Sequence, residues 1–209
     1  MEIKYRDLKK ILNETVKERG KLKPNVPVYR HVEFVVNGQL KIPNLLIDCG
    51  DYCSYEDTVD VINYYKASLL LDPKQNDLWG KMALNYHLNN ENKKALKHID
   101  KALVIDEKDV KHLELKQSIL IRLRRFSEAL FLFEQIDKLN PTSSIAYFNR
   151  GKAFIELGFY DKAIISLLKA MELDLEEKEI PFYLAKIYRF YMLDEALAEK
   201  YEAMAGLIP

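Results

Sequence analysis

One short phrase recurs three times in this sequence and decides its fold: KKAL at residues 93–96, SEAL at 127–130 and DKAI at 161–164. The alanines of successive phrases stand 34 residues apart, and apolar residues follow each alanine four and seven positions later. This spacing puts apolar side chains on one face of an α-helix, and the small alanine in that face lets a neighbouring helix approach closely. The sequence therefore predicts three equivalent helices.

A further helix is expected ahead of each of these. Residues 79–86 carry an apolar stripe with the i, i+3, i+4, i+7 spacing of a helix face, and residues 147–154 repeat its register 68 residues later. The breaks expected between the two helices of each unit are Asn89-Asn90, Arg124-Arg125 and Gly158. Each unit is therefore expected to be a helical hairpin.

These residues together resemble a known repeat family. They are Trp79, Met82, Ala83, Tyr86, Ala95 and Ile99 in the first unit, Ala129, Phe133 and Pro141 in the second, and Tyr147, Gly151 and Phe154 in the third. The chain resembles the tetratricopeptide repeat, whose pattern runs Trp-x2-Leu-Gly-x2-Tyr, then Ala-x3-Phe, then Pro. The first unit lacks the closing proline, and the second has Leu113, Lys116 and Gln117 where an aromatic residue, leucine and glycine stand in the family.

The resemblance covers residues 76–209 and implies an all-α repeat fold, an α-α superhelix of stacked helical hairpins. In tetratricopeptide-repeat proteins the first helix of each pair lines a concave groove that holds a peptide or a helix. The resemblance therefore implies a non-catalytic scaffold for protein-protein interaction.

We expect an N-terminal cap at residues 1–53 and helical repeats at residues 54–209. Within the repeats, the expected units are a partial repeat at 54–75, repeats at 76–109, 110–143 and 144–177, and a degenerate repeat at 178–209. The degenerate repeat has Pro181 in the aromatic position, and its version of the phrase, DEAL at 194–197, comes one residue early. Ser54 and Asp57 form a capping box that predicts the helix of the partial repeat.

The cap is expected to combine a helix and a β-hairpin. An apolar stripe on residues 5–16 predicts an amphipathic helix that ends at Gly20. Strand-like residues flank Asn37-Gly38, a strong hairpin signal, across residues 26–47. A lone hairpin is marginally stable, so we expect it to cover one apolar end of the repeat stack. At the C-terminal end we expect self-association, contact with a partner, or a last helix with its charged face outwards.

The composition excludes several function classes. The 209 residues include 32 basic and 32 acidic side chains, a balance that argues against nucleic-acid binding. Only 7 Gly and 7 Pro favour long helices over many short strands. The first twenty residues are too charged for a signal peptide, and no stretch approaches the ~20 apolar residues of a membrane helix. We therefore expect a cytoplasmic protein with no membrane partner.

The sequence offers little for catalysis. It contains no Gly-rich phosphate loop, nucleophile elbow or His-Glu-x-x-His motif, so we expect no enzymatic activity and no cofactor. Cys49 and Cys53 are expected to be free thiols, and with His31 they would form at most a partial metal site. The alternative is a ligand- or metal-dependent, even catalytic, segment at residues 26–56 that uses the repeats as a docking arm. RNA binding is a third alternative, weakened by the balanced charge.

The groove that the resemblance implies is lined by residues off the packing stripe of each first helix. In its downstream half, aromatic and basic residues alternate, which suits a partner segment with apolar anchors and a few acidic groups. The residues expected to bind a partner are His87, Lys111, Arg122, Phe148, Lys152, Phe182, Lys186, Arg189 and Phe190.

One specialisation of the family is not expected here. Members that hold the carboxylate tail of chaperones use Lys, Asn and Arg side chains from three successive first helices. In the family the five positions hold, in order, Lys and Asn, then Asn, then Lys and Arg. In this sequence they hold Gly80, Leu84, Leu115, Ile145 and Asn149, so no position matches.

Overall fold

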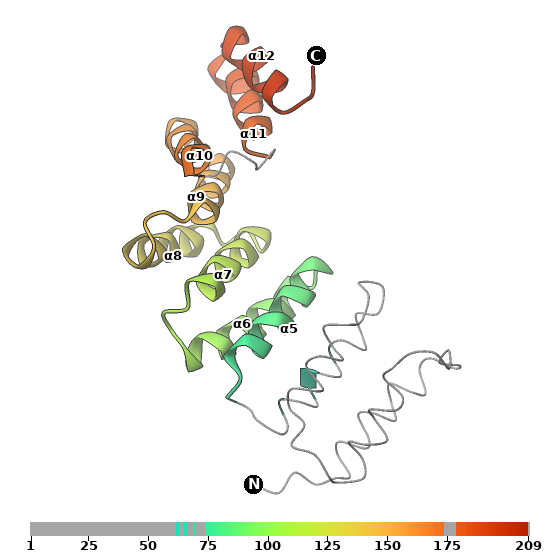
Figure 1. Ribbon diagram of the computed structural model, residues 1–209. Helices are drawn as coiled ribbons and strands as arrows, with labels where there is room; N and C mark the ends of the chain where they lie inside the picture. Colours follow the sequence, from blue (N-terminus) through green and yellow to red (C-terminus); the bar gives the residue numbers. More distant parts are fainter. Residues whose placement is uncertain (1–61, 63–64, 67–68, 70–73, 174–178, 209) are drawn as a thin grey trace, which may run out of the picture. The chain divides into compact units, whose positions relative to one another are not determined.

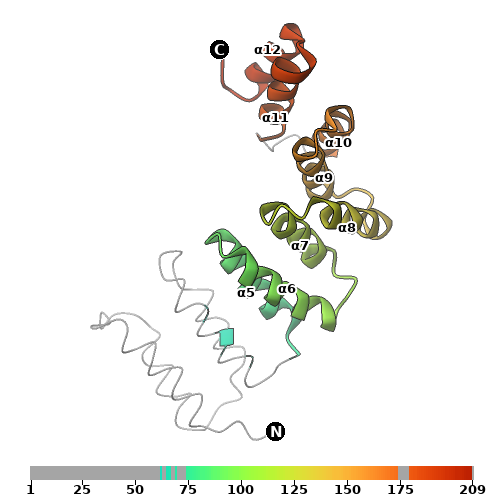
Figure 2. The same cartoon turned by 180° about the vertical axis from the view of Figure 1, so that it is seen from behind.

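The computed structural model describes residues 62, 65–66, 69, 74–173 and 179–208 (Figures 1 and 2). The chain divides into two compact units, Met1–Asp106 and Glu107–Pro209. Every described element is helical, so the all-α repeat fold expected from the sequence is confirmed. The predicted N-terminal helix, the hairpin around Asn37-Gly38 and the capping box at Ser54 lie outside the described residues.

The first unit contains α5 (Asn76–Leu88) and α6 (Asn92–Ile105), which pack against each other (Figure 1). The core residues are those of the predicted stripes: Leu78, Met82, Ala83 and Tyr86 from α5, and Ala95, Ile99 and Ala102 from α6. Upstream, Ile62, Tyr65 and Leu69 are helical and buried, as the i, i+3, i+7 spacing of the partial repeat predicts.

The second unit contains three further helix pairs. They are α7 (Val110–Arg122) with α8 (Phe126–Leu139), α9 (Ser144–Glu156) with α10 (Tyr160–Leu173), and α11 (Glu179–Ile187) with α12 (Glu195–Met204). A π-helix, η2 (Tyr188–Met192), extends α11. None of the described helices is long and apolar enough to span a membrane.

The two helices of the third repeat lie very close together, and Gly151 makes this possible. A Cβ atom built on Gly151 would lie 2.8 Å from the buried side chain of Leu167 on α10. Ala163 and Ala170 line the same face of α10 and are fully buried. The small residues at the predicted repeat positions therefore permit the close approach of α9 and α10, as the sequence predicts.

The first helices end in the same way in three repeats. Asn90, Arg124 and Gly158 have positive φ angles, and the next N–H donates to the carbonyl five residues before it, as in Glu91 to Tyr86 (2.8 Å). This is the Schellman arrangement, which satisfies carbonyls that the helix end leaves without partners. The predicted breaks at Asn89-Asn90, Arg124-Arg125 and Gly158 are confirmed.

The fourth repeat differs by one residue, and the sequence prediction for it was wrong. The positive-φ residue is Leu193, and the next N–H, that of Asp194, donates to the carbonyl of Tyr188, six residues back (2.9 Å). The π-helix takes up this extra residue. Consequently Ala198 is buried where Ala163 is buried in the third repeat, whereas Ala196 of the DEAL phrase is exposed. The repeat position thus comes one residue late, not one residue early.

Candidate functional site

Four of the predicted binding residues come together on the first helices of the last two repeats. Phe148 and Lys152 lie on α9, and Phe182 and Lys186 lie on α11. The side chains of Phe182 and Lys186 are exposed, whereas Phe148 and Lys152 are half-buried. The spacing of these residues along each helix is four, which places them on one face.

Tyr183 joins the two helices into one cluster. Its ring centroid lies 5.9 Å from that of Phe148 and 5.7 Å from that of Phe182. The Lys152 Nζ lies 4.8 Å from the Phe148 centroid and 5.7 Å from the Tyr183 centroid, and the Lys186 Nζ lies 5.3 Å from the Phe182 centroid. We call Phe148, Lys152, Phe182, Tyr183 and Lys186 the aromatic–lysine cluster.

Acidic and basic groups surround the Tyr183 ring. Burial raises the pKa of its phenol, and the nearby Glu179 and Glu156 carboxylates raise it further, whereas the Arg122 guanidinium lowers it. Glu179 also lies 3.9 Å from the Lys152 ammonium. Because Arg122 belongs to α7, charges from three successive first helices act on one phenol. The second unit therefore brings α7, α9 and α11 side chains to a shared face.

Tyr183 was absent from the sequence prediction, although a signal for it existed. It lies four residues after Glu179 and three before Lys186, a spacing that puts it on the helix face they share. The prediction took the residues that lie off the packing stripe of each first helix, and this count included Phe182, the residue before it, but not Tyr183. Both rings in fact lie in the cluster, in an edge-on arrangement with an interplanar angle of 73°.

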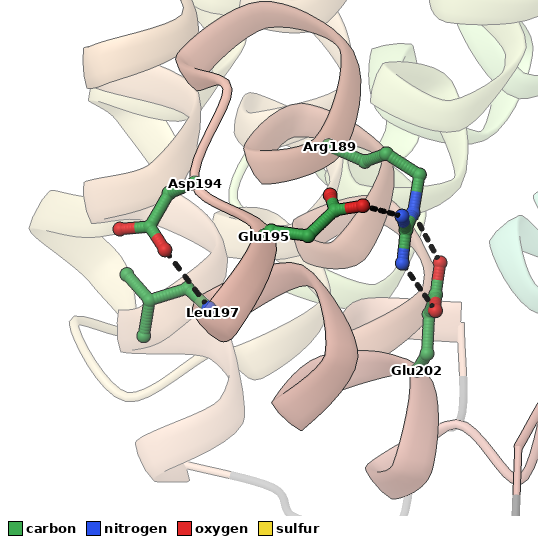
Figure 3. A network of polar contacts seen from close by, with 5 residues as sticks. All are labelled: Arg189, Asp194, Glu195, Leu197 and Glu202. Atoms are coloured by element: carbon green, nitrogen blue, oxygen red, sulfur yellow. Dashed lines mark hydrogen bonds and ion pairs between the residues drawn. The ribbon is translucent and has the colours of Figure 1, made fainter.

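Arg189 does not join the cluster. From the π-helix η2, its guanidinium donates two hydrogen bonds to the Glu202 carboxylate (both 2.8 Å) and one to Glu195 (2.7 Å), as Figure 3 shows. Asp194 caps α12 beside this network by accepting from the N–H of Leu197 (3.0 Å). The hydrogen bonds to Glu202 raise the pKa of Arg189 and lower that of Glu202. Arg189 thus fastens α12 to the end of α11.

Three further predicted binding residues are not part of the cluster. Phe190 is 64% exposed in η2, and Lys111 is exposed at the start of α7. His87 belongs to the first unit, where its Nδ1 lies 2.6 Å from the Asn92 Oδ1. The predicted partial metal site of Cys49, Cys53 and His31 lies outside the described residues.

The same first helices carry buried polar groups. Ser143 donates to the Glu114 carboxylate (2.5 Å) and accepts from the N–H of Ala146 at the start of α9 (3.0 Å). The Asn149 side chain is buried, and its amide nitrogen has no hydrogen-bond partner among the described residues. A buried amide donor without a partner is costly, so this group can stabilise an acceptor that reaches it.

Residues 145–177 match the family model of the tetratricopeptide repeat. Over 141 residues the chain is 24% identical to anaphase-promoting complex subunit 3 of Schizosaccharomyces pombe; the match covers 68% of this chain and 21% of that protein. The chain therefore spans about a fifth of the length of this curated relative.

Solved structures show the same fold. MamA from Desulfovibrio magneticus, at 19% identity, has a TM-score of 0.69, and the match covers 79% of this chain and 94% of MamA. The first tetratricopeptide-repeat domain of Spaghetti (RPAP3), solved bound to the HSP90 peptide SRMEEVD, has a TM-score of 0.52 at 21% identity, over 56% of this chain and 94% of that one. The helix pairs, the repeat match and these structures agree with the resemblance seen in the sequence: the chain has the tetratricopeptide-repeat fold, and residues 145–177 match the family model of that repeat.

Proposed function

We propose that this protein is a non-catalytic interaction scaffold that holds a segment of a partner protein on the face shared by α9 and α11. The observation that carries this proposal is the aromatic–lysine cluster. Its three rings and two ammonium groups lie on adjacent first helices, and two of its members, Phe182 and Lys186, remain exposed.

The cluster supports a partner segment with two kinds of side chain. Rings that are already in contact offer apolar area at low entropic cost, which is why aromatic residues dominate binding energy at interfaces. Lys152 and Lys186 beside these rings favour an acidic group on the ligand. The unpartnered amide nitrogen of Asn149 adds a donor for a backbone carbonyl or a carboxylate. A short peptide with an apolar anchor next to an acidic residue fits this arrangement.

The relatives support the class of function and not the partner. The peptide bound to the Spaghetti domain has acidic residues, but the five positions that hold a chaperone tail in the family differ in this sequence. We therefore propose a peptide ligand without proposing that chaperone as its source.

Selection from a displayed library of random peptides against the full chain would test the proposal. The selected peptides should combine apolar and acidic residues, and Phe182→Ala and Lys186→Gln should each weaken their binding by about tenfold, as loss of an interface anchor does. Exposed lysines of α8 and α12, changed in Lys138→Gln and Lys200→Gln, give matched controls. Selected peptides that bind all four variants as tightly as the parent chain would place the site elsewhere.

A further inference from the structure

The second helix of the first unit carries a row of exposed lysines. Lys94, Lys97 and Lys101 lie three and four residues apart on α6, so they share one face of the helix. That face points away from the core residues Ala95, Ile99 and Ala102. At 1.5 Å per residue, the three charges span about 10 Å of the helix. We call these three residues the basic stripe.

The fold uses little of this charge. Lys94 forms an ion pair with Glu91. For Lys97 and Lys101, no ion pair with a carboxylate is found in the described part of the chain. The position of the lysines at the start of the helix is also unfavourable for stability. The N-terminal turn of α6 contains Lys93 and Lys94 and no acidic residue. Cations destabilise that end of a helix. Ion pairs and the helix dipole therefore do not account for the stripe.

Aromatic rings contact two of the three lysines of the stripe. The Lys101 Nζ lies 4.1 Å from the Trp79 ring centroid, and the Lys94 Nζ lies 5.4 Å from that of Tyr86. The His98 ring lies between the two, 5.8 Å from Trp79 and 5.0 Å from Tyr86. Cation–π contacts of this kind orient the ammonium groups. Ordered charges lose less entropy on binding than freely moving lysines.

Further positive charge converges on the same place. Burial lowers the pKa of His98, and the ammonium groups of Lys101, Lys66 and Lys97 lower it further. Lys66 comes from the helical segment ahead of α5 and so adds a fourth cation to this surface. Three ammonium groups from two helical segments therefore act on the His98 ring.

The stripe continues into an apolar end. One turn beyond Lys101, the side chain of Val104 is 86% exposed, and that of Ile105 beside it is 41% exposed. Exposed apolar side chains next to ordered cations are typical of an interaction surface rather than of a solvated helix face.

We propose that α6 binds an acidic amphipathic segment of another protein, with carboxylates against Lys94, Lys97 and Lys101 and an apolar side chain against Val104 and Ile105. Complementary charge at a spacing of three and four residues suits a partner helix. A nucleic-acid strand fits less well, because the chain has no excess of basic over acidic side chains and a phosphate backbone offers no apolar group to Val104 and Ile105.

This surface can be tested with a designed helical peptide that has glutamates three and four residues apart and leucines at one end. Its control is the same peptide with glutamine for each glutamate. Trp79 is the single tryptophan of the chain and lies under Lys101, so its fluorescence emission reports binding. We expect the full chain to bind the glutamate peptide at least about tenfold more tightly than the glutamine peptide, with an affinity that falls as salt is raised.

Variants assign the binding to the stripe. A triple variant that removes the charge of the stripe should bind the dye-labelled glutamate peptide about tenfold more weakly or worse, as measured by fluorescence anisotropy. Its substitutions are Lys94→Gln, Lys97→Gln and Lys101→Gln. Combined Lys138→Gln, Lys162→Gln and Lys200→Gln removes the same charge from exposed lysines of other helices and should leave the affinity unchanged. Circular dichroism verifies that both chains are folded.

Zero-length carbodiimide crosslinking then locates the peptide directly, because it joins a lysine to a carboxylate only when the two are in contact. Crosslinks at the basic stripe support the proposal. Crosslinks at Lys152 or Lys186, equal affinity of the stripe variant, no binding of the glutamate peptide, or tighter binding of a single-stranded oligonucleotide would each overturn it. The basic stripe and the aromatic–lysine cluster belong to different units and are tested with different variants. The experiments can therefore contradict one proposed binding site and still support the other.

Discussion

The third and fourth repeats have the same design and differ by one residue. In the third, Gly158 ends the first helix, and the N–H of Phe159 donates to the carbonyl of Phe154 (2.9 Å). In the fourth, Leu193 takes that place after a π-helical turn. Ala163 and Ala198 are nevertheless equally buried. The packing of the two helices therefore determines which alanine is buried in each repeat. The turn between the helices changes its conformation to accommodate one residue more or less.

The extra residue changes the surface and leaves the core intact. Tyr188 of η2 stacks on the buried Tyr201 of α12 with ring centroids 5.6 Å apart. Phe190, Tyr191 and Met192 are exposed, although Tyr191 stacks on Tyr160, and Leu193 is 81% exposed. A π-helical turn is therefore tolerated because its additional volume lies in solvent.

The strongest test of this comparison replaces alanines of the last helix with glutamate. Ala198→Glu buries a carboxylate in the core and should destabilise the protein by more than about 3 kcal/mol, whereas Ala196→Glu adds an exposed charge and should change stability by no more than about 0.5 kcal/mol. Urea unfolding followed by circular dichroism measures both. The reverse order of effects would show that the DEAL phrase keeps the repeat position.

A smaller change in stability is expected at the position where the third repeat has glycine and the fourth has alanine. The fourth repeat has Ala185 where the third has Gly151, one repeat earlier. Because a Cβ atom at Gly151 would lie 2.8 Å from Leu167, Gly151→Val should cost about 1–3 kcal/mol through overpacking.

Gly151→Ala should show a smaller loss of stability at the same position. It adds only the Cβ atom, and the helix preference of alanine over glycine, up to about 1 kcal/mol, offsets part of the clash. Thermal unfolding of both variants should therefore give a larger loss for valine than for alanine. Equal stability of the two would mean that α10 moves away without cost.

The sequence predicts the helix pairs of the described residues because packing alone sets them. Apolar residues recur every 34 positions, and small residues stand where helices must approach closely, as at Gly151. The π-helix could not be predicted in this way. Its extra residue lies in an apolar stretch that fits a continuous helix, and the DEAL phrase offers a false match to Ala196.

The candidate site was predictable in part for a similar reason. Phe148, Lys152, Phe182 and Lys186 follow from the faces of single helices. The role of Tyr183 as a link between α9 and α11, and the pairing of Arg189 with Glu202, depend on contacts between elements. Such contacts depend on the separation and rotation of the helices, and these quantities are absent from a repeat pattern.

The turns that end the first helices of the third and fourth repeats allow a third test, in which their positive-φ residues, Gly158 and Leu193, are exchanged. Gly158 adopts its positive φ without strain, and a Cβ atom there would meet nothing within 4 Å, so Gly158→Leu should cost about 1 kcal/mol through the left-handed backbone alone. Leu193→Gly removes that strain from the fourth repeat and should stabilise the chain by up to about 1 kcal/mol. Chemical unfolding of the two single variants and of the double variant measures both changes. A loss of stability in Leu193→Gly would indicate that the leucine side chain packs favourably on the turn.

The smallest effect is expected from the ion pairs that accompany the extra residue (Figure 3). Glu202→Gln removes the carboxylate that Arg189 holds at 2.8 Å. Because both side chains are half-buried and still reach solvent, the loss of stability should be modest and reduced by salt. Arg189 lowers the pKa of Glu202 in the folded chain, so the stabilisation is complete above the ordinary glutamate pKa of about 4.3 and is lost as the pH falls through the lowered value.

The difference in stability between wild type and Glu202→Gln should therefore shrink as the solution is acidified below that ordinary value. Glu156→Gln is the matched control in the third repeat, since its ion pair with Arg124 (3.1 Å) is more exposed and should contribute less. Urea unfolding at neutral and acidic pH gives both differences. If the stability difference between wild type and Glu202→Gln stayed constant on acidification, the glutamate would stabilise α12 through packing of its methylene groups. The polar network would then be a consequence of the π-helical turn and would not stabilise it.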